Sequence, residues 1–277
     1  YGDHRDLHLS IRRQRQMCIR DSDGSLHRLT PERAVDIQCS LGADIQMVLD
    51  VCPPIPAEKK VLEIAVERTH KWAIRGRNHF LLREKSFENE RAQFGIVQGG
   101  LDPKLRQISA EQIVEIGFDG YAIGGLSVGE TRQEMIEPMQ ISADALPNQQ
   151  PRYFMGLGDP AGLVEAIACG VDMFDCVWPT RLARHGTALT MQGRVNLGAA
   201  RYAKSDDAID PDFHTSLASR WSRGYIRHLL SVGEPVAARL LTLHNLAWII
   251  DFMKRARESI IQGTFDDFQK ETLEIWG

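Results

Sequence analysis

The chain has 277 residues, a formal net charge of −4 and an ordinary globular composition with 43% hydrophobic residues, enough for one core and a small additional domain. No run of about 18 apolar residues and no charged-then-apolar leader occurs, so the sequence predicts neither a membrane span nor a signal peptide and favours a cytoplasmic location. The negative charge argues against indiscriminate nucleic-acid binding, and five cysteines without a Cys-x-x-Cys pair favour reduced thiols over a disulfide framework.

Residues 1–22 carry many charges without an apolar period and join abruptly onto Asp23. The string Arg15-Gln16-Met17-Cys18-Ile19-Arg20-Asp21-Ser22 resembles translated sequencing-adapter read-through. We therefore expect residues 1–22 to be a non-native leader, and resequencing the gene upstream of Asp23 tests this hypothesis.

From residue 30 onward, predicted strands and helices alternate. A threonine followed by proline at 30–31 predicts a helix that ends at Gly42, and a strand is expected at 43–49. Apolar residues recur at helical spacing over 62–73, ahead of a strand at 93–97.

The same alternation continues in the following segment. Ser109 and Gln112 have the spacing of a capping box, which predicts a helix from there to Gly117. Further strands are expected at 120–124, 152–156 and 171–174, and Asp159-Pro160 begins a helix between the last two.

Alternation of this kind is typical of a parallel sheet. Reactive or close-approach residues follow the predicted strands, as in a (β/α)8 TIM barrel, where catalytic groups gather at the carboxyl ends of the strands. Five strand-helix units can be counted, so we expect an incomplete TIM barrel whose other strands lie unrecognised before residue 30 or are missing by truncation. The residues that follow the strands are Asp50, Gln98-Gly99-Gly100, Gly124-Gly125, Gly156 and Asp175.

The C-terminal part has a different pattern, with a short β-prone stretch at 187–196 and mainly helical patterns from 219 to 276. We expect a partial barrel domain over 23–200 and a helical subdomain over 201–277. Bases outnumber acids between Arg181 and Arg227, which is compatible with a nucleic-acid-binding patch and equally with a solvated surface.

Two strand-end acids, Asp50 and Asp175, suggest glycosidic chemistry, because one carboxylate can attack an anomeric carbon while another orients the leaving group. Alone this signal is weak, since aspartates often cap turns after strands. Three long motifs add to it: Phe94–Gly100, Gly117–Glu130 and Phe174–Arg181 closely resemble the bacterial tRNA-guanine transglycosylase family, and the similarity runs in order from Asp23 to about Phe268.

The resemblance implies exchange of guanine at the tRNA wobble position for a 7-deazaguanine precursor of queuosine, through a covalent intermediate. Asp175 would be the nucleophile. Asp50 would accept from the amidine edge of the base, while Gln98 and the backbone N–H of Gly125 would donate to its carbonyl. The remaining base-site residues would be Leu126, through its carbonyl, Glu130 as its support, Met155 and Gly156 over the base face, and Cys52 and Val128, which match bacterial members that take the small precursor.

The resemblance also implies contacts with macromolecules. Arg181 and Arg184 match positions that contact the tRNA anticodon stem-loop, although His185 replaces a usual asparagine. An aromatic cluster matches the family's homodimer interface, but two of its members at i, i+4 would also make an ordinary helix core stripe. The cluster consists of Trp221, Tyr225 and His228.

Three departures from the family pattern matter. The Asp-Ser-Gly-Gly-Tyr motif that holds the general acid/base aspartate has no counterpart, so we expect poor autonomous folding and no turnover for the chain as given. The three cysteine positions of the family's structural zinc site hold Phe213, Thr215 and Ala218, leaving only His244, so we expect no metal site. Val51 replaces a usual glutamate.

Two alternative functions remain open. One is a noncatalytic tRNA-binding or partner subunit of the same family, which the presence of Asp175 disfavours. The other is a paralogue that inserts deazaguanines into DNA, which the arginines at tRNA-contact positions disfavour only weakly.

Overall fold

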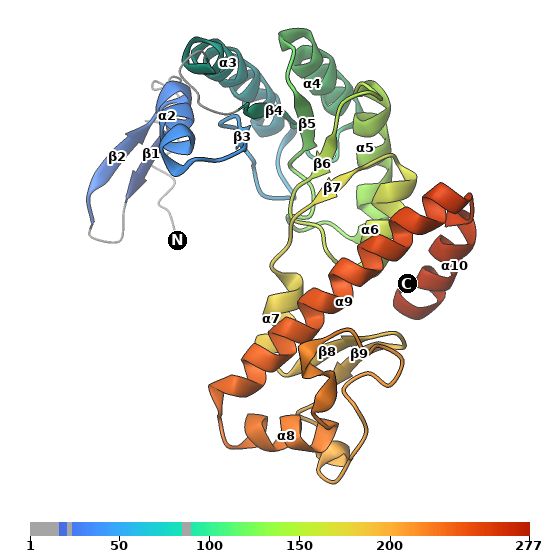
Figure 1. Cartoon of the computed structure of the whole chain (residues 1–277). Coiled ribbons are helices and arrows are strands. Elements are labelled where there is room, and N and C mark those ends of the chain that lie inside the picture. Colours follow the sequence, from blue (N-terminus) through green and yellow to red (C-terminus); the bar gives the residue numbers. More distant parts are fainter. Residues whose placement is uncertain (1–16, 21–23, 85–89) are drawn as a thin grey trace. The chain divides into compact units, whose positions relative to one another are not determined.

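The computed structural model describes residues 17–20, 24–84 and 90–277 (Figure 1). They form two compact units: the first comprises the described residues up to Met155 together with Cys169–Met173, and the second comprises Gly156–Ala168 and Phe174–Gly277. The domain boundaries expected from the sequence, at 22/23 and 200/201, stay predictions; the latter lies inside the second unit.

The first unit begins with a strand pair and a capped helix. Strand β1 (Met17–Arg20) pairs antiparallel with β2 (Leu26–Leu29). Helix α2 (Pro31–Leu41) starts after Thr30, whose hydroxyl accepts from the backbone N–H of Arg33, and ends at Gly42 with a φ of 75°. The predicted bounds of this helix are confirmed. Most of the expected leader lies outside the described residues.

A five-stranded sheet forms the framework of the barrel-like part, with each strand next to its neighbour in sequence order (Figure 1). The predicted incomplete (β/α) barrel with a C-terminal helical part is confirmed, and the paired residues of β3 to β6 show parallel register. Strand β4 begins one residue before its predicted start, whereas the other four strands are shorter than predicted. The five strands are β3 (Ile45–Met47), β4 (Ala92–Val97), β5 (Gly120–Ile123), β6 (Arg152–Phe154) and β7 (Met173–Phe174).

Helices follow the strands as the alternation predicts. In the first unit, α3, α4 and α5 lie side by side along one face of the sheet (Figure 1), and neighbouring helices are in contact. The helices are α3 (Lys59–Glu84), α4 (Pro103–Ile116), α5 (Arg132–Ala145) and, in the second unit, α6 (Pro160–Ala168).

The predicted start of α4 was wrong. The helix begins at Pro103, where the Asp102 carboxylate accepts from the backbone N–H of Leu105 at 3.0 Å. Aspartate before a proline at the first helical position is a strong start signal. Ser109 consequently lies in the middle of the helix, and its hydroxyl accepts from the backbone N–H of Gln98 at 2.9 Å.

Two glycines allow close packing between β4, β5 and the helices. A Cβ on Gly120 would lie 2.4 Å from the Phe94 ring, and one on Gly95 would lie 2.5 Å from Ile113. Phe94, Ile113 and Phe118 are buried here. Side chains larger than hydrogen at these positions would force the interior apart.

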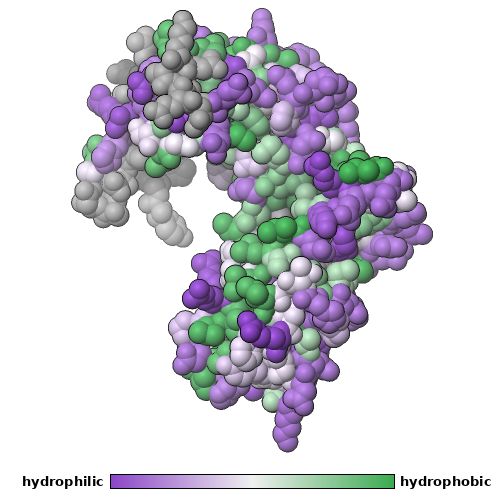
Figure 2. Space-filling view, in the orientation of Figure 1, coloured by the Kyte–Doolittle hydropathy of each residue, from purple (hydrophilic) through white to green (hydrophobic). Residues whose placement is uncertain are grey.

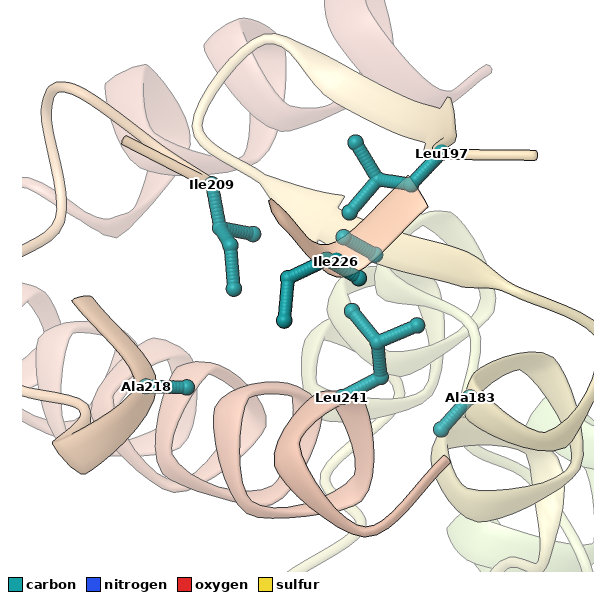
Figure 3. Packing of buried hydrophobic residues seen from close by; sticks show 7 residues of the cluster. Ala183, Leu197, Ile209, Ala218, Ile226 and Leu241 are labelled. Carbon is teal, nitrogen blue, oxygen red and sulfur yellow. The ribbon is translucent and has the colours of Figure 1, made fainter. Parts of the chain in front are cut away.

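The second unit combines a β-hairpin with helices around an apolar cluster. The hairpin confirms the predicted β-prone stretch, and the helices confirm the helical pattern after residue 219. Side chains of the cluster converge from several of these elements (Figure 3): Ala183, Ala188, Leu197, Ile209, Ala218, Ile226 and Leu241. The elements are α7 (Trp178–Arg184), β8 (Thr187–Thr190), β9 (Gly193–Asn196), η1 (Ala200–Tyr202), η2 (Leu217–Arg220), α8 (Arg223–Ser231), α9 (Pro235–Gln262) and α10 (Phe265–Trp276).

Helix α9 is the one helix in the described part of the chain that is long and apolar enough to span a membrane by length and composition. It also packs against α7, α8 and α10, and buries polar residues such as His244 and Asn245. Hydrophobic side chains remain visible on the surface of this unit (Figure 2), and the exposed ones on α9 include Leu243, Leu246 and Ile250.

Candidate functional site

In the first unit, an acid and an amide meet at the ends of two neighbouring strands. The Gln98 side-chain N–H donates to the Asp50 carboxylate at 2.6 Å, and Gln98 itself is buried. Burial raises the pKa of Asp50, while the hydrogen bond from Gln98 opposes that rise. The structure thus brings together the two side chains that the sequence assigned to the same base.

The Gly124-Gly125 turn passes directly over Gln98. A Cβ on Gly125 would lie 2.3 Å from the Gln98 side-chain oxygen, and a Cβ on Gly124 would lie 2.9 Å from its nitrogen. Gly125 also has a φ of 69°, in the left-handed region that favours glycine. Both glycines are therefore required by the closeness of the backbone to Gln98.

Cys52 lies near Asp50, Gly125 and Gln98. Burial raises the pKa of its thiol, and the nearby Asp50 carboxylate adds to that effect. Hydrogen bonds from the backbone N–H of Gly125 and from the Gln98 side chain act in the opposite direction. Gly125, Gln98 and Cys52 therefore lie close to one another beside Asp50.

Glu130 hydrogen-bonds the backbone of the loop that follows this turn. Its carboxylate accepts from the backbone N–H of Ser127 and, at 3.0 Å, from that of Val128. Because a trans peptide directs its N–H and C=O to opposite sides, the carbonyl of Leu126 points away from Glu130. The Leu126 side chain is buried, whereas Val128 is exposed. Glu130 thus hydrogen-bonds the Leu126–Ser127 peptide, and its role in binding a base stays a prediction.

The second unit holds the predicted nucleophile. Asp175 is exposed, and one of its carboxylate oxygens accepts from the backbone N–H of Gly156 at 2.9 Å. Nearby, a Cβ on Gly158 would lie 2.4 Å from the Cβ of Cys176, so the two segments approach closely. Met155, the last residue of the first unit's main segment, is partly buried.

The expected tRNA-contact residues lie together on α7. Arg181 and Arg184 are both exposed. His185, which ends this helix, makes a ring-nitrogen hydrogen bond of 2.8 Å with the carbonyl of Arg181. Two exposed guanidinium groups on one short helix suit phosphate recognition.

The aromatic cluster has a different local geometry from a helix stripe. Trp221 precedes α8 rather than lying one turn before Tyr225 within it, so the i, i+4 interpretation was wrong. The two rings nevertheless stack, with centroids 4.8 Å apart and planes at 26°. Tyr225 and His228 are exposed, whereas Trp221 is partly buried against the second unit's apolar cluster.

The residues at the family's zinc positions do not fit a metal. Phe213 packs in an apolar cluster and meets the His244 ring edge-to-face at 5.8 Å, and Ala218 faces the cluster of Figure 3. Thr215 is exposed. His244 hydrogen-bonds the carbonyl of Leu189 at 2.8 Å through Nε2. One histidine without thiolates cannot make a tetrahedral zinc site.

Sequence reasoning missed a buried arginine beneath the Gly124-Gly125 turn. Arg106 lies in the first turns of α4 and donates to the Gly124 carbonyl at 2.6 Å. A signal was available, since Arg106 shares a helix face with Ala110 and Ile113, both apolar and buried. An arginine on such a face must find polar partners inside the protein.

Comparisons with known proteins show the family to which the chain is related. The family model described as queuine tRNA-ribosyltransferase matches residues 6–277. The chain belongs to the queuine tRNA-ribosyltransferase family. Its relatives are named as transferases, and the resemblance seen in the three motifs is confirmed.

Three relatives carry the name "Queuine tRNA-ribosyltransferase". The protein of Thermotoga neapolitana is 46% identical over 254 residues, which cover 92% of this chain and 67% of that protein. The protein of Zymomonas mobilis is 44% identical over 90% of this chain and 64% of its own length. The protein of Agrobacterium fabrum is 44% identical over 92% and 66%. The chain thus spans about two thirds of the length of these relatives.

Proposed function

We propose that the chain carries the base-binding and nucleophilic parts of a tRNA-guanine transglycosylase. The observation that supports the base site best is the pairing of Asp50 with Gln98 at 2.6 Å next to the Gly124-Gly125 turn, where a carboxylate acceptor lies beside amide donors. A guanine-type base presents the complementary edge, with an amidine that donates and a carbonyl that accepts.

In the proposed reaction, a carboxylate oxygen of Asp175 attacks C1′ of the wobble guanosine. The bond between C1′ and N9 breaks, and guanine leaves with the electron pair and gains a proton. The transition state is cationic at the sugar, so an anionic nucleophile stabilises it before the bond forms. The exposed position of Asp175 leaves it accessible to a large substrate.

The second half of the reaction reverses the first with a different base. N9 of the 7-deazaguanine attacks C1′ and loses its proton, the bond from C1′ to Asp175 breaks, and the carboxylate is regenerated. The proton donor and acceptor would be the aspartate of the Asp-Ser-Gly-Gly-Tyr motif. This chain contains no such motif.

Recognition of tRNA is proposed for the exposed arginines of α7, Arg181 and Arg184, which would bind the anticodon stem-loop. The stacked pair of Trp221 and Tyr225 with His228 would form the homodimer interface. A tRNA-modifying role is consistent with a cytoplasmic location.

The remaining residues of the base site are proposed to surround the precursor. The Leu126 carbonyl would accept from the aminomethyl group of the precursor, with Val128 beside it and Met155 and Gly156 over the base.

Calorimetric titration of the chain with 7-aminomethyl-7-deazaguanine tests the base site. We expect saturable binding that Asp50→Asn abolishes, because the amide would place a donor against the amidine of the base. Asp44→Asn is the matched control, since Asp44 is an exposed acid just before the same strand. Equal binding by the wild type and Asp50→Asn would contradict the proposed base site.

A further inference from the structure

Arg106 is completely buried, although arginine is rarely found away from water. Burial lowers the pKa of its guanidinium to about 9, so the side chain stays charged at neutral pH. Cys52 and Glu130, in their ionised forms, act against that shift in the pKa of Arg106, so both residues of the base site lie close to the arginine. A buried charge next to a binding site needs a specific reason, because its desolvation is costly.

The guanidinium joins two helices to the end of β5. Its Nε donates to the Ser142 hydroxyl of α5 at 2.7 Å, and its Nη1 donates to the Gly124 carbonyl at 2.6 Å. Ser142 is itself oriented by donating to the carbonyl of Pro138 at 2.7 Å. The remaining nitrogen, Nη2, is buried without a hydrogen-bond partner among the described residues.

The bond to Gly124 determines where the next N–H points. In a planar trans peptide, the Gly124 carbonyl and the Gly125 N–H face opposite directions. Arg106 holds the carbonyl from one side, so the Gly125 N–H is directed to the opposite side of the peptide. This peptide could otherwise rotate readily, because neither flanking residue has a side chain to restrict it.

We propose that Arg106 is a positioning residue that locks the Gly124–Gly125 peptide so that its N–H is aimed at the carbonyl oxygen of the bound base. This inference rests on the proposed function and extends it to specificity. Arg106 acts through Gly125, and therefore helps to distinguish bases that carry the carbonyl from bases that lack it. Preorganised backbone donors of this kind discriminate strongly because an unmatched buried donor is costly.

The test compares two bases and two buried arginines. The bases are 7-aminomethyl-7-deazaguanine and its analogue without the 6-oxo group. Arg106→Lys keeps the charge but loses the fork that spans Ser142 and Gly124. Arg152→Lys is the matched control, because Arg152 is also buried and also donates to a backbone carbonyl, that of Leu146, but lies at the start of β6, away from the strand ends that hold the base site.

We expect Arg106→Lys to weaken binding of the oxo base about tenfold, which corresponds to the loss of one well-placed hydrogen bond. Binding of the 6-deoxo analogue should stay within about twofold of the wild type. Ser142→Ala, which leaves Arg106 in place without its second anchor, should change the ratio of the two affinities in the same direction. Arg152→Lys should leave that ratio unchanged.

A merely structural role for Arg106 would weaken both bases equally, and that result would overturn the inference. Hydrogen exchange of the Gly125 amide provides a readout that needs no ligand. It should be faster in Arg106→Lys and unchanged in Arg152→Lys. Unchanged exchange in a folded Arg106→Lys protein would also overturn the inference, whereas absent binding by the wild type together with accelerated exchange would contradict only the proposed base site.

Discussion

The side-chain amide of Gln98 donates to the carboxylate of Asp50 over 2.6 Å. Burial raises the pKa of Asp50, and this hydrogen bond favours the ionised form that burial disfavours. The two residues follow neighbouring strands of the sheet, β3 and β4. The hydrogen bond from Gln98 therefore helps to keep the Asp50 carboxylate ionised, as a hydrogen-bond acceptor, in a partly buried site.

Binding of 7-aminomethyl-7-deazaguanine should depend on the ionisation of Asp50. A protonated carboxyl cannot accept two donors, so affinity should fall as the pH is lowered through the raised pKa of Asp50, above the usual range for aspartate. Titrations from pH 4 to pH 7 measure this midpoint. Affinity that is constant over this range would contradict the role of Asp50, and Asp44→Asn should reproduce the wild-type profile.

The order of strands and the residues at their ends could be predicted from the sequence, because alternation and glycine-rich strand exits are local signals. The buried side chains that hold these strand ends in place could not be predicted from the sequence. Arg106 contacts Gly124 and Ser142, which lie 18 and 36 residues away in the chain. Only the packing of α4 against α5 brings these groups together.

Asn245 should be important for the stability of the second unit. Its side chain accepts from the N–H of Leu189 at 2.9 Å and donates to the carbonyls of Pro179 and Thr187 at 2.9 and 3.0 Å. Asn245→Ala leaves these buried groups without partners, so we expect a loss of about 2–5 kcal/mol in the free energy of unfolding. Urea denaturation of the wild type and of Asn245→Ala measures this difference in the free energy of unfolding. Gln262→Ala, at an exposed position of the same helix, should change it by less than about 0.5 kcal/mol.

His244 should make the second unit less stable in mild acid. Burial lowers its pKa below 6.5, against the opposing effects of its bond to the Leu189 carbonyl and of Asp210. The unfolded chain therefore binds a proton at a higher pH than the folded chain, so this contribution to stability is lost as the pH falls below 6.5. His244→Gln keeps a donor and removes the titration. The difference in unfolding free energy between pH 7.5 and pH 5.5 should be smaller in His244→Gln than in the wild type.

Metal removal should have no effect on this family member. The zinc positions hold Phe213, Thr215 and Ala218, and the first and last of these pack in apolar clusters. We expect the melting temperature to be the same with and without a chelator such as EDTA. Elemental analysis that finds one zinc per chain, or a chelator-induced drop in melting temperature, would contradict this account.

The acid/base group is the part of the proposed reaction that this chain does not supply. We expect no guanine exchange by the chain as given. Turnover should appear in a version extended at its N-terminus by a segment that carries the Asp-Ser-Gly-Gly-Tyr motif. Release of labelled guanine from an anticodon stem-loop RNA measures the activity of the chain as given and of the extended version. Robust turnover by the unextended chain would show that another residue transfers the proton.

Covalent trapping tests the central claim most directly. The extended version is incubated with anticodon stem-loop RNA, denatured, and analysed by mass spectrometry of its peptides, with a DNA hairpin of the same sequence as the comparison. We predict an RNA adduct on the peptide that contains Asp175, absent from Asp175→Asn and from the DNA reaction. An adduct at another residue, or one that persists in Asp175→Asn, would contradict the assignment of Asp175 as the nucleophile.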